Sequence, residues 1–393
     1  MIKNILKFFL YLLILITIVV VYLSYFGIET KRFNQLIKNK ISDSTKEIDI
    51  ELQEVKIVLD LSNLSIGLKT FDSNVIFKNK KIKLKKIGTN FSIESFFKKE
   101  FAIKNVLIKT KKNNLKDIIS LIRIYQNTPK LFIFNKMIKE GFVIADISLN
   151  FDDQGKLTKR YNINGSIRDG KLRLFNKKNI DNINFDFHLK EKKYLLEKGQ
   201  INYEKIKLSS RKINIIDKEK YFLFEGDLSS AKSSIHSNLI TAIFKNNLEN
   251  IGINNIHLSS ENNFSFELGE KFKISNFKID SKIDLQKMTY KNKSNSLKKV
   301  VLNYKDSIDL VDHKIELFLN KNKLLIKGNG NYSIDEKIDK INYEIQYSDS
   351  KYNFKSQIEL NNLPLQFKLF NYTKRENKNA LLNIEGLYKK NYS

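Results

Sequence analysis

Apolar and polar residues alternate along most of the chain beyond residue 48. The clearest runs are Val143, Ala145, Ile147, Leu149 and Phe151; Ile183, Phe185, Phe187 and Leu189; Ile315, Leu317 and Leu319; and Ile341, Tyr343, Ile345 and Tyr347. Because successive side chains of a β-strand point to opposite faces, each run predicts a strand with one apolar face and one polar face. Such strands are typical of antiparallel sheets. The fold class expected is therefore mainly β.

Short segments rich in Gly, Asn and Asp separate the predicted strands. These residues favour turns, since Gly accepts a positive φ and the side chains of Asn and Asp bond to nearby backbone groups. The candidate turns are 152–155, 168–170, 225–227, 320–323 and 328–331. Many strands in series, mostly joined as hairpins, are therefore predicted.

One helix is predicted to interrupt the strands. Apolar residues share one helical face at Leu115, Ile118, Ile119, Ile122 and Tyr125. Asn114 precedes this run as a candidate N-cap, and Thr128-Pro129 is expected to close the segment. The pattern predicts a helix over 114–128 and a further β region that begins near Leu131.

Two other segments depart from strand alternation. Phe33, Leu36, Ile37 and Ile41 recur at helical spacing, which predicts a short amphipathic helix. A Ser-rich stretch at 228–250 is expected to be a helix or a loop.

These elements divide the chain into five segments. They are a transmembrane helix at 1–28, an amphipathic connecting helix at 29–44, a first β region at 45–130 that ends in the helix, a second β region at 131–230, and a third at 231–393 after a short helix or loop.

A single long apolar run lies near the N-terminus, where no charged residue occurs from Phe8 to Ile28. A helix of this length is about 30 Å long, the thickness of the hydrocarbon core of a bilayer. The run is longer than the core of a cleavable signal peptide and leads into aromatic instead of small residues, so an uncleaved anchor is predicted. The anchor residues include Phe8, Leu12, Leu15, Val19 and Leu23.

The charges that flank this run set its expected orientation. Lys3 and Lys7 precede it, whereas the basic residues that follow belong to a long domain whose charge does little to resist translocation. The N-terminus is therefore expected in the cytoplasm, the helix in a bacterial inner membrane as a single span, and the bulk of the chain in the periplasm. Tyr22, Tyr25 and Phe26 would form an aromatic belt at the outer interface.

The predicted strands are nearly all one-sided, and no apolar run beyond residue 30 exceeds a handful of residues. This favours an elongated, curved antiparallel sheet, a groove with an apolar concave face, which carries one or two short helices. Two one-sided sheets packed face to face as a sandwich are the alternative.

The formal charge of +27 changes this picture little. Nucleic-acid binding requires clustered Lys and Arg, because clustered charges release counterions from phosphates. The densest basic runs, Lys78 to Lys86 and Lys109 to Lys116, instead alternate with apolar residues or lie at turns, as solvated strand faces do. No nucleic-acid partner is expected. An anionic-polymer binder, which would show one contiguous basic patch, is the weakest of the alternatives.

No motif for catalysis, cofactor binding or metal binding is recognised in the sequence. The histidines His188, His236, His257 and His313 lack metal-ligand spacing, and no cysteine is present. The pair Asp152-Asp153 has no third ligand nearby in the sequence. We therefore expect no enzyme, no cofactor and no metal site.

The layout resembles that of AsmA-like proteins, a family that includes TamB and YhdP. The resemblance is carried by the anchor, the stretch from Ile28 to Ile37, the serial strands, and the segment from Tyr161 to Leu174 with its Gly165 and Asp169-Gly170. It implies a bridge-like lipid transporter of the bacterial envelope, whose β groove carries phospholipid acyl chains between membranes or supports outer-membrane assembly. Members are often longer, so a short member, a truncated product or one unit of a split gene is implied.

The resemblance also implies an apolar groove lining and, as a further partner, an outer-membrane β-barrel or another envelope protein. The lining residues expected are Val143, Ile147, Leu149, Phe185, Phe187 and Leu189. Each of them has an ordinary core role as its alternative. The competing function is a membrane-tethered periplasmic β scaffold that binds a protein partner by strand addition at an exposed edge.

Overall fold

The computed structural model describes residues 2–389 apart from 33, 36–37, 40–46, 62–64, 93–102, 126, 153, 155, 157, 159, 175–177, 205, 236–251, 270–272, 292–296, 303 and 322. The chain forms two compact units, an N-terminal unit (Met1–Leu196) and a C-terminal unit (Glu197–Ser393). Strand β12 (Lys193–Tyr203) contains the division between them. Each unit is mainly β and its strand pairs are antiparallel, which confirms the predicted fold class.

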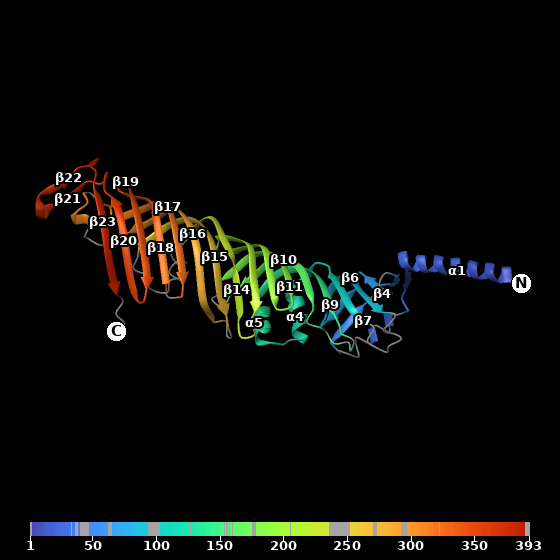
Figure 1. The fold of residues 1–393 in the computed structure, drawn as a ribbon. Helices are drawn as coiled ribbons and strands as arrows, with labels where there is room; N and C mark the ends of the chain where they lie inside the picture. The colour runs from blue at the N-terminus through green and yellow to red at the C-terminus, as the bar shows by residue number, and fades with distance from the viewer. Residues whose placement is uncertain are drawn as a thin grey trace. The chain divides into compact units, whose positions relative to one another are not determined.

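The N-terminal unit begins with a helix and continues with an antiparallel sheet (Figure 1). Its elements are α1 (Ile2–Tyr25), β1 (Ile28–Thr30), β2 (Ile48–Glu51), β3 (Val55–Asp60), β4 (Ser65–Phe71), β5 (Asn74–Phe77), β6 (Lys80–Ser92), β7 (Ile103–Thr110), β8 (Asn113–Asn114), α4 (Leu115–Tyr125), α5 (Pro129–Met137), β9 (Ile138–Asn150), β10 (Asn162–Arg173) and β11 (Asn179–Lys190). Neighbouring strands follow the order β1, β3, β4, β6, β7, β9, β10, β11, while β5 joins β2 to β6.

The C-terminal unit is a serial meander of long strands (Figure 1). Its elements are β13 (Ile206–Asp217), β14 (Phe222–Ile235), β15 (Gly252–Leu268), β16 (Ile274–Lys291), a 3₁₀ turn (Leu297–Lys299), β17 (Ser307–Asn320), β18 (Lys323–Ile334), β19 (Lys337–Ser348), β20 (Lys351–Glu359), β21 (Leu365–Phe367), a 3₁₀ turn (Lys368–Phe370), β22 (Tyr372–Lys374) and β23 (Leu381–Lys389). Consecutive strands from β13 to β20 pair with each other, and β23 pairs with β20. The connection from β20 to β23 contains the hairpin of β21 and β22, which is a separate two-stranded sheet.

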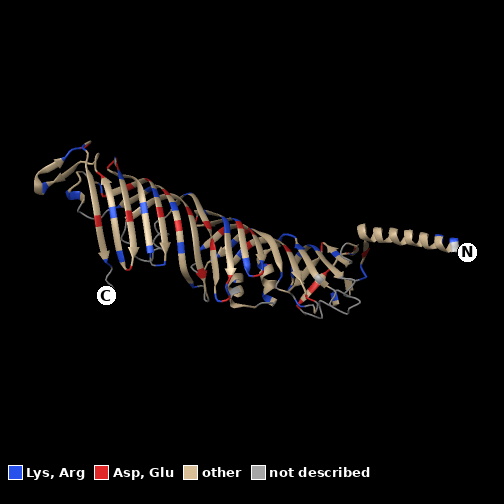
Figure 2. Cartoon of the chain, viewed as in Figure 1, with Lys and Arg blue, Asp and Glu red and all other residues tan. Residues whose placement is uncertain are grey.

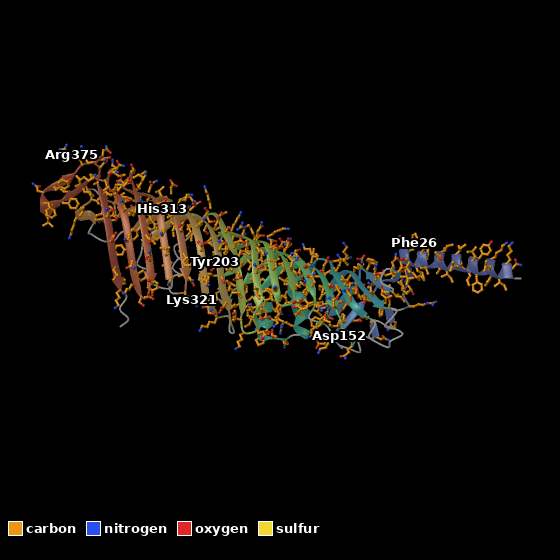
Figure 3. All side chains as sticks on the ribbon, viewed as in Figure 1. Phe26, Asp152, Tyr203, His313, Lys321 and Arg375 are labelled. Carbon is orange, nitrogen blue, oxygen red and sulfur yellow. The ribbon has the colours of Figure 1, made fainter. Side chains whose placement is uncertain are left out.

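Helix α1 is long and apolar enough to cross a membrane, and it contains all five predicted anchor residues. Phe8, Leu12, Leu15 and Val19 are exposed, as a bilayer-facing surface requires. Figure 2 shows charged residues in α1 only towards its N-terminal end, and Figure 3 places Phe26 just beyond its last turn. A membrane-anchoring role for this helix is consistent with these features.

The helix predicted over 114–128 is confirmed in part. Asn114 caps α4, because its Oδ1 accepts a hydrogen bond of 2.9 Å from the backbone N–H of Lys116. Helix α4 ends at Tyr125, before Thr128-Pro129, as predicted. A second helix then follows that was not predicted: Thr128 caps α5, and Pro129 occupies its first turn, where no donor is lost. The next strand consequently begins at Ile138 and not near Leu131.

Three of the predicted turns are wrong, because those residues lie inside strands. At 168–170 the strand β10 bulges, with Asp169 at φ 54° and a shift in register against β11. At 225–227 Asp227 lies within β14, where its carboxylate accepts hydrogen bonds from the backbone N–H groups of Arg211 and Lys212. Bulges and polar strand residues share the composition of turns, which explains the error.

The third of these segments, 328–331, lies in β18, and its two glycines leave space for side chains of neighbouring strands. A Cβ added at Gly328 would lie 2.2 Å from the ring of Tyr343, and one added at Gly330 would lie 2.4 Å from the ring of His313. Both glycines therefore make room for rings of adjacent strands. The remaining two predictions hold: 320–323 joins β17 to β18, and Asp152 closes a turn by accepting hydrogen bonds from the N–H groups of Gln154 and Lys156.

Two further segments, 228–250 and 29–44, were predicted to depart from strand structure. Residues 228–235, expected as helix or loop, belong to β14, where Ser230 lies opposite Ser260 and their hydroxyls are 3.0 Å apart. The rest of that stretch, 236–250, lies outside the described residues. The connecting helix predicted at 29–44 is confirmed in part: Asn34, Gln35, Lys38 and Asn39 are helical, whereas its first two positions belong to β1. The apolar residues on which it was predicted, Phe33, Leu36, Ile37 and Ile41, lie outside the described residues.

Candidate functional site

One face of the C-terminal sheet is mainly apolar along its long strands, with Asp217, Asn262, Ser281 and Ser356 as polar positions on it. The register carries this face from strand to strand, since Ile279 of β16 lies opposite Phe264 of β15 and Leu319 of β17. Directly opposed residues point to the same side of a sheet. Following the register, the face contains Ile213, Ile215, Phe222, Phe224, Phe264, Phe266, Ile279, Ile283, Leu285, Met288, Tyr290, Ile308, Leu310, Ile315, Leu317, Leu319, Leu324, Ile326, Tyr332, Ile334, Ile341, Tyr343, Ile345, Tyr347, Tyr352, Phe354, Ile358, Leu382 and Ile384.

Most side chains of this apolar face are half-buried, because they pack mainly against neighbours on adjacent strands. Ring pairs show this lateral packing: the rings of Phe224 and Phe266 are stacked with centroids 4.8 Å apart, and those of Tyr347 and Tyr352 are 4.5 Å apart. Cross-strand pairs of this kind stabilise a sheet while leaving their outer surface open to an apolar ligand.

The opposite face of the same sheet is charged and polar. Acidic and basic side chains alternate across neighbouring strands, as in the pairs Lys327 with Glu344 at 3.2 Å and Lys355 with Glu385 at 3.4 Å. Figure 2 shows both signs of charge interspersed along these strands. Exposed pairs of this kind contribute little stability, but they keep this face in water.

A pocket of about 650 Å³ lies on the apolar face of the C-terminal unit, within the range of small-molecule sites. Its eighteen lining side chains include no charged residue, and its only polar side-chain groups are two tyrosine hydroxyls. They are Ile253, Met288, Tyr290, Leu297, Val300, Val301, Ile308, Leu310, Tyr332, Ile334, Ile341, Ile358, Leu360, Leu363, Leu365, Phe367, Leu382 and Ile384. A site with this composition suits hydrocarbon.

Two connections form one side of this pocket. Val301, from the connection between β16 and β17, is bridged to Leu365 of β21 and is buried with Leu363 against Tyr332 and Ile334. The hydroxyl of Tyr332 donates a hydrogen bond of 2.6 Å to the carbonyl oxygen of Glu359, and burial raises the pKa of this phenol. The hydroxyl therefore stays neutral and directed at the backbone.

The six predicted lining residues all lie on one face of the N-terminal sheet. Val143, Ile147 and Leu149 alternate along β9, and Phe185, Phe187 and Leu189 alternate along β11. Strand β10 joins the two sets, because Ile163 lies opposite both Ile147 and Leu189. The predicted grouping of these side chains on one apolar surface is thus what the register shows, while a role in lining a lipid groove stays a prediction.

Helix α4 covers part of that surface. Leu115 of α4 is buried with Val143, Ala145, Phe187 and Ile138, and Ile147, Phe185 and Leu189 pack against the same cluster. Figure 1 shows α4 and α5 beside these strands. At Val143 and Phe187, which are buried, the side chains have a core role, whereas Leu149 is half-buried outside the cluster.

The pocket residues of the C-terminal unit were not among the predicted lining. The alternation of the run at Ile341 places it on an apolar face, but Val300, Leu363 and Leu365 come from connections without periodicity. Only the register, together with the bridge between Val301 and Leu365, brings these segments onto the strands.

The histidines that the structure describes form no common site. His188 bonds to Asn164 on the polar side of the N-terminal sheet, and His313 is buried on the apolar face of the C-terminal sheet. His236 lies outside the described residues. Within the described residues, no group of three or more His, Cys, Asp or Glu side chains is placed to hold a metal ion.

His313 is held as a neutral ring among the aromatic residues of the face. It is 1% exposed, its Nε2 lies 2.9 Å from the carbonyl oxygen of Asn331, and the hydroxyl of Tyr343 is 3.4 Å from its Nδ1. Burial lowers the pKa of His313 despite the opposing effects of Asn331 and the Asp312 carboxylate. Burial also raises the pKa of Tyr343 to about 12.

We expect acid to destabilise the C-terminal unit through His313. The pKa of His313 is lower in the folded chain than in the unfolded chain. As the pH falls, the unfolded chain therefore takes up a proton first. The contribution of His313 to the free energy of unfolding is fully present above the unfolded pKa of about 6.5 and is lost as the pH drops below it. The slope contributed is at most about 1.4 kcal/mol per pH unit. Urea unfolding of the full chain in micelles, followed by circular dichroism from pH 8 to 5, measures it. His313→Gln should remove this contribution and His188→Gln should not; equal pH profiles for wild type and His313→Gln would contradict it.

Comparison with known proteins identifies no relative: no protein-family model, no curated protein and no solved structure matches this chain.

Proposed function

We propose that this chain is a membrane-anchored lipid-binding protein that moves phospholipid acyl chains along the apolar faces of its sheets. The observation that carries the proposal is the apolar face of the C-terminal unit, with its pocket lined by eighteen side chains that include no charged residue. The function is phospholipid transport between membranes or support of outer-membrane assembly. It requires no catalytic residue and no cofactor.

Elementary energetics support this function. Each CH₂ group of an acyl chain gains about 0.8 kcal/mol on leaving water for an apolar surface. A row of interchangeable apolar side chains offers similar affinity at every strand, so a chain can slide without meeting a deep trap. The polar opposite face keeps such a sheet in water while its apolar face is occupied by lipid.

The proposed place of action is the periplasm, with α1 in the inner membrane and the N-terminus in the cytoplasm. Lys3 and Lys7 support this orientation, because basic residues near a span favour the cytoplasmic side. The resemblance to AsmA-like proteins supports the same placement. In that setting the partners are phospholipid, the inner membrane, and an outer-membrane β-barrel or other envelope protein.

Photo-crosslinking in living cells tests the proposal with the full chain. A photoreactive amino acid at Leu310, on the apolar face, should form adducts with radiolabelled phospholipid, whereas the same group at the adjacent Asp309, on the polar face, should not. A second pair, Ile345 and Glu344, repeats the comparison on β19. Protein adducts without lipid at both apolar positions would contradict lipid binding and favour a scaffold.

The competing scaffold function rests on one specific observation. Strand β23 pairs with β20 along one edge, and no partner on its other edge occurs among the described strands. Eight of its nine residues are exposed. A free edge of this kind accepts an added strand from another protein. This function predicts protein adducts at β23 and no lipid on the apolar face.

A further inference from the structure

The hairpin of β21 and β22 presents an apolar tip to solvent. Phe367 lies opposite Tyr372 with ring centroids 6.3 Å apart. The 3₁₀ turn between the strands is followed by Asn371, whose φ of 48° turns the chain back. Leu369 is 95% exposed and Phe370 is 79% exposed, while Tyr372 is 57% exposed and Phe367 is 36% exposed. These four side chains are defined here as the hairpin tip.

The base of this hairpin is held firmly by the C-terminal unit. Leu365 is buried, and the N–H of Gln366 donates a hydrogen bond of 2.8 Å to the carbonyl oxygen of Val300. The buried Lys374 donates from its Nζ to the carbonyl oxygens of Asn361, Leu363 and Arg375 at 3.0–3.1 Å. A buried ammonium group with three acceptors fixes the returning strand. The apolar tip therefore projects from a hairpin whose base is fixed by hydrogen bonds and burial.

Two lysines lie beside the hairpin tip, and one arginine lies at the base of the hairpin. Lys299 and Lys368 line a shallow hollow together with Leu369 and Phe370. Arg375 follows β22 at the base of the hairpin, where Figure 3 labels it. No acidic residue lines the hollow among the described residues. Apolar and aromatic side chains flanked by lysines are typical of surfaces that insert into the boundary of an anionic bilayer.

We propose that the hairpin tip inserts into the surface of a lipid bilayer that carries anionic headgroups. Size favours a bilayer over a protein partner, because a standard protein interface takes about 800 Å² from each side and a tip of four side chains is too narrow to supply it. A bilayer accepts such a narrow wedge, since the acyl region closes around it and the headgroups neutralise Lys299 and Lys368.

The tip is continuous with the apolar pocket. Val300 and Phe367 line both the hollow at the tip and the pocket on the sheet. A chain drawn from the bilayer beside Leu369 would therefore meet apolar side chains along its way to Leu310. If the chain transports lipid as proposed, this continuity places the entry or exit of the lipid path at the hairpin. Bilayer insertion itself does not depend on the proposed lipid transport.

A single tryptophan tests the insertion directly, because the chain contains none. The full-length Phe370→Trp variant is held through α1 in nanodiscs of neutral phosphatidylcholine, and vesicles of equal phosphatidylglycerol and phosphatidylcholine are added. The emission should shift to the blue and should be quenched when the vesicle lipids carry brominated acyl chains. Phe318→Trp, an exposed position on the polar face of β17, is the matched control and should show neither change.

A vesicle-capture measurement completes the test. Leu369→Ser with Phe370→Ser should reduce capture of the anionic vesicles about tenfold or more, because two apolar side chains leave the bilayer. Lys299→Gln with Lys368→Gln should weaken capture and flatten its salt dependence. Unchanged emission from Phe370→Trp, equal quenching at Phe318→Trp, or equal capture of purely neutral vesicles would each overturn the inference. Phospholipid adducts at Leu310 would still be expected if only the tip inference failed.

Discussion

Changing Ile341 to Asp should abolish phospholipid adducts at Leu310 in the C-terminal unit. Ile341 lies on β19 in the wall of the pocket, opposite Ile358 of β20. An ionised carboxylate at this position must either keep its water or take up a proton, and both costs amount to several kcal/mol when an acyl chain covers it. Occupancy should fall about a hundredfold or more. The yield of radiolabelled adduct from a photoreactive group at Leu310 measures this loss.

The adjacent residue supplies the matched control for this variant. Asn342→Asp adds the same carboxylate one position along β19, on the polar face, and it should leave the yield at Leu310 unchanged. Ile384→Asp, at a 37% exposed position of the edge strand β23, tests the same pocket with less risk to folding. Circular dichroism verifies that each variant is folded. Full adduct yield in folded Ile341→Asp and Ile384→Asp would contradict the pocket as a lipid site.

Truncating Phe187 to Ala should destabilise the N-terminal unit by about 3–5 kcal/mol, the usual cost of removing a buried aromatic ring. Phe187 is 8% exposed beneath α4 and packs with Leu115 and Val143. Its ring also covers Gly165 of β10, where an added Cβ would lie 2.6 Å from Cζ of the ring, so truncation would leave an empty space over this glycine. Urea unfolding of the full chain in micelles measures the free energy lost.

Leu149 provides the comparison for Phe187 on the same apolar face. It is half-buried on β9 opposite Val106 and lies outside the cluster under α4. Leu149→Ala should therefore lower the free energy of unfolding by less than about 2 kcal/mol, which is below the usual range for truncations in a core. Equal losses for the two variants would show that the whole face is a packed core, which would remove the N-terminal unit from the proposed lipid path.

The period-two pattern was sufficient to predict the strands and their faces. Ile147, Phe187 and Ile341 alternate with polar neighbours, and alternation is a local property that the pleat of a strand converts directly into a face. The long apolar helix α1 was predicted for the same reason, since length and apolarity along one segment are enough to define it. The cap at Asn114 is also local, because its side chain bonds two residues ahead.

Predictions failed where a local signal serves two structures. Gly328 and Gly330 carry the composition of a turn, yet they lie within β18 because Tyr343 and His313 on neighbouring strands need the space. Thr128-Pro129 fits both the end of one helix and the start of the next; the structure has both, and only the end of α4 was predicted. No information within a few residues distinguishes these alternatives, since the deciding partner lies in another strand or helix.

The sequence by itself determined the long apolar N-terminal helix, the mainly β fold and the apolar side of the strands, because each depends on the order of apolar and polar side chains along a short segment. The tertiary structure alone decided which part of that apolar side is covered and which part forms a site. Helix α4 covers Val143 and Phe187, whereas two connections around Val301 and Leu365 fold against β18 and shape the pocket. Those arrangements depend on strand register and on contacts between residues distant in sequence, which no local pattern encodes.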